Sequence, residues 1–124
     1  MPHPPSGRAP GEVVEKHQLA GFDERERGFN RQVEIDRQDD RYAASFRYET
    51  TLVATDRQET QAAALAELVR LLQARGYRQL RSRVSFRGDA YLGSQEAWIE
   101  YPDQAWLTRV LQGFLRRFTR SSRT

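Results

Sequence analysis

Arginine is the most frequent residue type in this chain that could do chemistry. Nineteen of its twenty basic residues are arginine, and Lys16 is the one lysine. A guanidinium group can hold a phosphate or a carboxylate through two parallel hydrogen bonds. The arginines are therefore candidates for recognising such groups. A GC-rich genome, in which arginine codons replace lysine codons, explains the same composition, and we favour that explanation.

Several arginines share one face of a predicted strand. Between residues 77 and 88, apolar residues alternate with polar ones, which is the two-residue period of a half-buried strand. We expect Leu80, Val84 and Phe86 to face the core. The opposite face then carries one serine and three arginines, namely Ser85, Arg81, Arg83 and Arg87.

A tryptophan lies on the strand that we expect to pair with this one. The segment 96–101, EAWIEY, also alternates, so that Trp98 shares a face with two glutamates. The expected cross-strand pairs are Phe86 with Ala97, Val84 with Ile99, Arg87 with Glu96, and Arg83 with Glu100. Ion pairs across strands are worth a few tenths of a kcal/mol to about 1 kcal/mol.

Arginines beside an aromatic residue suit two kinds of binding. They can hold backbone phosphates and stack on a base, as in RNA-binding sheets. Tryptophan and arginine are also over-represented at the hot spots of protein interfaces. A further arginine stripe lies on a predicted C-terminal helix. The candidate binding surface consists of Arg81, Arg83, Arg87, Trp98, Arg109, Arg116 and Arg120. An ordinary solvated sheet face is the alternative to both kinds of binding.

Catalytic and metal-binding motifs are weak in this sequence. Both histidines, His3 and His17, fall in an N-terminal segment that we expect to be flexible, and the chain has no cysteine. Gly88 and Gly93 have the spacing of a phosphate-binding loop, but the Lys and Ser or Thr that must follow are missing. We therefore expect no catalytic residues, no cofactor, no metal ion and no enzymatic activity.

The N-terminal segment, residues 1–29, is predicted to be flexible. Four prolines and two glycines fall within its first eleven residues, a composition that buries too little apolar surface to offset the entropy of ordering. Residues 12–20 could form two helical turns. The main domain is expected over 30–120, followed by a frayed tail at 121–124.

A hairpin is expected at the start of this domain. Residues alternate on both sides of Asp39–Asp40, and aspartate tolerates the left-handed backbone of a tight turn. With the turn there, Val33 pairs with Phe46 and Ile35 with Ala44. The second strand is predicted to continue to Leu52. The expected pairs are mutually consistent, because both strands then present their apolar residues on one face.

Two helices complete the predicted fold. Thr55 or Asp56 should cap a helix that ends near Arg75, where Gly76 suits a left-handed cap. A second helix should follow Pro102. The order ββαββα predicts an α+β two-layer sandwich, in which a four-stranded antiparallel sheet carries two helices on one face. A circularly permuted ferredoxin-like topology is our first hypothesis.

Composition and charge limit the functional classes. No apolar run approaches the ~20 residues that a membrane span needs, and no secretory signal is visible, so we expect a cytoplasmic protein. The formal net charge is +3, with the excess of basic residues after Asp56. We expect a non-enzymatic protein-binding or accessory module, with a protein partner or a second copy bound as a homodimer. The alternative is a nucleic-acid-binding module, and an enzyme ranks third.

Overall fold

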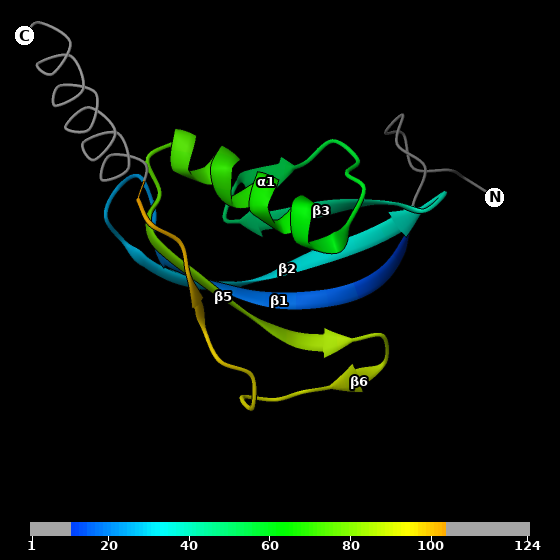
Figure 1. Ribbon diagram of the computed structural model, residues 1–124. Coiled ribbons are helices and arrows are strands. Elements are labelled where there is room, and N and C mark those ends of the chain that lie inside the picture. Colours follow the sequence, from blue (N-terminus) through cyan, green and yellow to red (C-terminus); the bar gives the residue numbers. More distant parts are fainter. Residues whose placement is uncertain (1–10, 104–124) are drawn as a thin grey trace, which may run out of the picture.

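The structure is a computed structural model that describes residues 11–103 (Figure 1). Seven antiparallel strands form one sheet in the order β4-β3-β2-β1-β5-β6, with β7 also paired to β5, and one helix lies across a face of the sheet. The strands are β1 (Glu12–Phe22), β2 (Gly28–Gln38), β3 (Arg41–Tyr48), β4 (Thr51–Ala54), β5 (Arg78–Arg87), β6 (Ala90–Tyr91) and β7 (Ile99–Glu100), and the helix is α1 (Gln61–Ala74).

The predicted four-stranded sheet with two helices is therefore wrong. The described residues form mostly sheet, with one helix and seven strands, so neither the two-helix sandwich nor the permuted ferredoxin-like topology is present in them. The second predicted helix, which includes Arg109, Arg116 and Arg120, lies outside the described residues, as do residues 1–10 and the predicted tail 121–124.

The largest correction concerns residues 12–22, which we placed in the flexible segment, with two helical turns over residues 12–20. They form β1, which pairs with β2 on one side and with β5 on the other. Leu19 of this strand is fully buried. Because two neighbouring strands satisfy the backbone of β1 on both edges, pairing overrides the weak local preference of this polar segment for a helix.

The β2–β3 hairpin is confirmed in its register. Val33 pairs with Phe46 and Ile35 with Ala44. Asp39 and Asp40 both have positive φ, 53° and 61°, as a two-residue hairpin turn with left-handed backbone requires. The apolar alternation and the turn chemistry therefore specified the same pairing.

The strand after this turn is shorter than predicted. β3 ends at Tyr48, and a tight turn that includes Glu49, with a φ of 54°, reverses the chain into β4. Leu52, which we placed on the same face as Phe46, is 58% exposed, and Val53 is buried beside Phe46 instead. The alternation continued through the turn in the sequence, so it did not reveal the reversal.

The helix α1 ends as predicted but begins later. Thr60, rather than Thr55 or Asp56, is its N-cap, and the Thr60 side chain accepts a hydrogen bond from the Ala63 amide. Thr55 instead accepts one from the Ala44 amide next to β4. The C-cap is Arg75, and Gly76 has a φ of 99°, which confirms the predicted C-terminal end.

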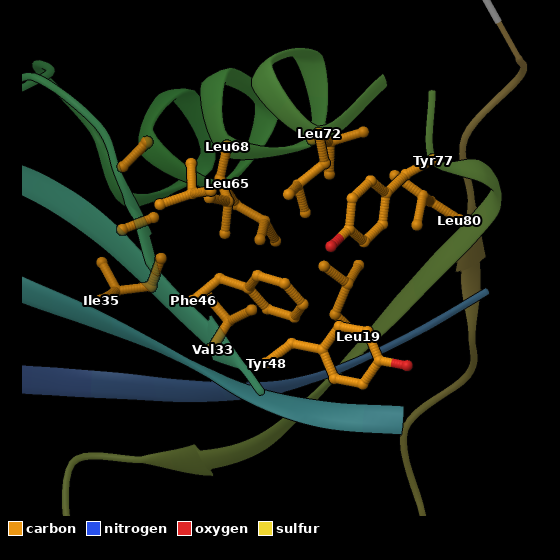
Figure 2. Close-up of a cluster of buried hydrophobic side chains, with 14 of the residues drawn as sticks. Leu19, Val33, Ile35, Phe46, Tyr48, Leu65, Leu68, Leu72, Tyr77 and Leu80 are labelled. Atoms are coloured by element: carbon orange, nitrogen blue, oxygen red, sulfur yellow. The ribbon is translucent and has the colours of Figure 1, made fainter. Parts of the chain in front are cut away.

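The core lies between α1 and the sheet face beneath it (Figure 2). α1 contributes Leu65, Leu68 and Leu72, which lie above Phe46 and Val33 in the close-up. Each large apolar side chain buried in this way contributes about 1.5–3 kcal/mol to the free energy of unfolding. α1 covers mainly β3, β4 and β2, so its packing leaves part of the β1 and β5 face uncovered.

The last predicted hairpin has a different register. Phe86 pairs with Tyr91 of β6, whereas Ser82 and Arg81 pair with Ile99 and Glu100 of β7. A tight turn at Gly88 and Asp89 reverses the chain directly after β5, so the end of β5 pairs with β6. Residues 92–98 then connect β6 to β7. The expected pairs of Arg87 with Glu96 and of Arg83 with Glu100 are therefore wrong.

Within residues 11–103, no helix is long and apolar enough to cross a membrane. The same residues contain no group of three or more histidine, cysteine, aspartate or glutamate side chains that could hold a metal ion.

Candidate functional site

A β-bulge in β5 divides the predicted arginine face. His17 pairs with Val84, but the preceding Lys16 pairs with Phe86, so Ser85 is an extra residue in β5. A bulge of this kind shifts the alternation, and every side chain beyond it changes face. Arg87 therefore lies on the α1 side of the sheet, where its Nε is 3.7 Å from Glu15 Oε2.

Arg81 and Arg83 lie on the opposite face of the sheet, which we call the outer face. There they contact Trp98. The guanidinium carbons of Arg81 and Arg83 are 5.0 and 4.4 Å from the centre of the Trp98 ring. At these distances a cation is attracted by the negative face of the aromatic ring. We call these three residues the Arg–Trp cluster.

A second cation–aromatic contact lies next to this cluster on the outer face. The Phe86 and Tyr91 rings are 5.0 Å apart, and Lys16 Nζ lies 5.2 Å from the Phe86 ring centre. Arg83 Nε donates a hydrogen bond to Gln18 Oε1 at 2.7 Å, and Gln18 lies two residues after Lys16 in β1. Tyr91 is 70% exposed.

The candidate surface predicted from the sequence is thus assembled in part. The structure brings Arg81, Arg83 and Trp98 together and places Arg87 on the other side. Lys16, Phe86 and Tyr91 belong to the same outer face but were not predicted. Lys16 was assigned to the flexible segment, and the alternation placed Phe86 in the core because the sequence gives no sign of the bulge.

The α1 side of the sheet carries a second polar group that the sequence analysis dismissed. His17 Nε2 is 3.0 Å from Glu15 Oε1, and their side chains are only 12% and 15% exposed. Both line a cavity between β1, β5 and α1. Glu15, His17 and Leu19 are every second residue, so they would share one face of a strand. Because two of the three are polar, this face did not look like the buried face of a strand in the sequence.

A third polar cluster lies at the β1–β2 turn and is structural. Asp23 is fully buried and accepts hydrogen bonds from the Arg25 and Arg27 amides and from the Tyr48 hydroxyl. Burial alone would raise the pKa of Asp23, but these hydrogen bonds and the Arg27 charge lower the pKa below its usual value. Burial and the bond to Asp23 raise the pKa of Tyr48. Arg27 also forms an ion pair with Glu49, so the cluster links the β1–β2 turn to the β3–β4 turn.

The chain has no match that suggests what these surfaces bind. No protein family model, no curated protein and no solved structure matches it.

Proposed function

We propose that this protein is a non-enzymatic module that binds another protein through the outer face of its sheet. The Arg–Trp cluster carries the proposal. Tryptophan and arginine dominate interface hot spots because they combine a large apolar area with directed hydrogen bonds. Here the Arg83 side chain is also held by Gln18, so less side-chain entropy is lost on binding.

The charge on the outer face indicates the chemistry of the partner. Lys16, Arg81 and Arg83 are cationic, and two acidic residues lie opposite them in the register, Glu34 opposite Lys16 and Glu100 opposite Arg81. These five groups carry one net positive charge. The partner should therefore present acidic side chains around an apolar contact. Rim charges of this kind accelerate association and orient the partner.

Binding of nucleic acid is the second candidate. It is favoured by the arginines that flank Trp98 and by five arginines, without an acidic residue, in the sequence after Asp103. Two observations weigh against it. Residues 11–103 carry fourteen basic and seventeen acidic groups, and two guanidinium groups already occupy the Trp98 ring on which a base would stack.

Alanine at Trp98 tests the protein-binding proposal. The full chain is used to isolate a partner by chemical crosslinking, and affinity for that purified partner is then measured by calorimetry. We expect Trp98→Ala to weaken binding about thirtyfold or more, as for a hot-spot residue. Arg70→Ala, on the exposed surface of α1, is the matched control and should change affinity less than about twofold. Equal affinity of the Trp98→Ala variant and the original chain would refute the proposal.

Salt dependence separates the nucleic-acid candidate from the protein-binding one. Fluorescence anisotropy with a labelled single-stranded RNA and a DNA duplex is measured at about 50 and about 200 mM salt. Nucleic-acid binding predicts an affinity that falls steeply between these conditions and falls again in an Arg81→Glu, Arg83→Glu double variant. Absence of binding at the lower salt concentration would leave the protein partner as the proposal.

A further inference from the structure

The cavity on the α1 side of the sheet has the form of a small-molecule site. It is partly open to solvent and has a volume of about 390 Å³, which is within the usual range of ligand pockets. Its floor is the part of β1 and β5 that α1 leaves uncovered, one wall is the first turns of α1, and the other wall is the segment before β7. It lies on the opposite face from the Arg–Trp cluster, so the two surfaces can be tested independently.

One part of the cavity is polar and held in place. Glu15 contacts His17 Nε2 at 3.0 Å and lies 3.7 Å from Arg87 Nε. In a neutral imidazole whose Nε2–H donates to a carboxylate, Nδ1 is an acceptor. In that tautomer the His17 ring can accept a hydrogen bond from a ligand.

The remaining lining is mostly apolar. Leu65 and Ala62 of α1 stand opposite Val84 and Ile99 across the cavity. Ile99 is 59% exposed, and covering it with a ligand would remove apolar surface from water, which is favourable.

The charges of the lining select among polar ligands. Glu15 and Glu96 are acidic and Arg87 is basic, which gives a formal charge of −1 when His17 is neutral. The Arg87 guanidinium already faces Glu15, whereas Glu96 makes no ion pair with the described residues. An anionic ligand would meet uncompensated negative charge, and a cationic one would be attracted.

From these observations we propose that the cavity binds a small organic amine. Its apolar body would contact Leu65, Val84 and Ile99, and its ammonium group would donate hydrogen bonds to His17 and to the carboxylates of Glu15 and Glu96. This site is independent of the protein-binding function proposed above.

Three probes with one aromatic body and different charges test the proposal. Tryptamine, 3-methylindole and indole-3-propionate are titrated into the full chain, and methyl resonances of Leu65, Val84 and Ile99 are followed by NMR. We expect tryptamine to shift these resonances with a Kd of about 1 mM or below. The neutral probe should bind more weakly, and the anionic probe weakest of the three.

Paired variants on one helix locate the binding. Ala62 lines the cavity, whereas Ala66, one turn later on α1, does not, and both are exposed. Ala62→Leu should fill the space and weaken tryptamine binding about tenfold or more, and Ala66→Leu should leave it unchanged. Both substitutions keep a strong helix former, so α1 should remain folded.

The exposed Glu96 allows the contribution of its negative charge to amine binding to be tested separately. Glu96→Gln should reduce the preference for tryptamine over 3-methylindole about two- to fivefold, since one partly solvated charge is removed. Three results would overturn the proposal: no methyl shift with tryptamine, tryptamine binding that survives Ala62→Leu, or tighter binding of indole-3-propionate than of tryptamine.

Discussion

At the scale of single residues, the polar groups of this protein fall into two kinds. Asp23 is surrounded by donors that require its charged form, so it serves the fold. Glu15 and His17 contact each other and line a cavity, and Arg81 and Arg83 lie over the partly exposed Trp98 ring. These four side chains contact their neighbours but also border a cavity or solvent, so they can still interact with a ligand.

Asp23 gives the fold a dependence on pH. Its pKa is lower in the folded protein than in the unfolded chain, so its contribution to stability is complete above the unfolded pKa of about 4. That contribution is lost as the pH falls through the lower, folded pKa. We expect Asp23→Asn to lower the midpoint of urea unfolding at pH 7, and the difference from the original chain to shrink below about pH 4.

The matched control for this substitution is Asp89→Asn, at the exposed turn after β5. It should leave the unfolding midpoint unchanged at both pH values. A difference between Asp23→Asn and the original chain that stays constant from pH 7 to pH 3 would contradict the role assigned to the Asp23 charge.

At the scale of elements, small irregularities decide which side chains meet. One extra residue, Ser85, moves Arg87 from the outer face to the cavity and Phe86 from the core to the outer face. The β3–β4 turn likewise replaces Leu52 with Val53 as the buried residue. The bulge determines the composition of both candidate binding surfaces, whereas the β3–β4 turn adds β4 to the sheet and decides which of its side chains reaches the core.

The start of α1 offers a direct test at this scale. Thr60→Ala removes the side-chain acceptor of the Ala63 amide and should lower the free energy of unfolding by about 1 kcal/mol. Asp56→Ala, at the position first expected to cap the helix, should cost clearly less because Asp56 is exposed before the helix begins. Urea unfolding of both variants measures the difference, and the reverse order would contradict this helix boundary.

At the scale of the whole molecule, β1 connects the two halves of the sheet. It lies between β2, which belongs to the part under α1, and β5, which carries the Arg–Trp cluster and one side of the cavity. Both candidate surfaces therefore depend on a strand whose residues read as polar and irregular in the sequence.

Leu19→Ala tests this central position of β1. Leu19 is fully buried, so its truncation should lower the free energy of unfolding by about 2–5 kcal/mol. Val13→Ala, in the same strand but with Val13 41% exposed, is the control and should cost less than about 1 kcal/mol. If residues 12–22 were flexible, both substitutions would have little effect on chemical unfolding.

The sequence by itself determined the features that depend on neighbours along the chain. The β2–β3 register followed from alternation around two aspartates, and the end of α1 followed from a left-handed glycine. The proximity of Arg81, Arg83 and Trp98 was also expected, because these residues lie on adjacent strands.

Only the tertiary structure decided the place of β1, the bulge at Ser85 and the cavity around His17. β1 is stabilised by hydrogen bonds to strands that are distant in sequence on at least one side, and a bulge is specified by the pairing of two strands rather than by one. Such contacts carry little local signature, since the strand preference of a residue depends strongly on the strands around it. Local patterns therefore predicted individual elements, whereas long-range pairing assembled the surfaces on which function is proposed.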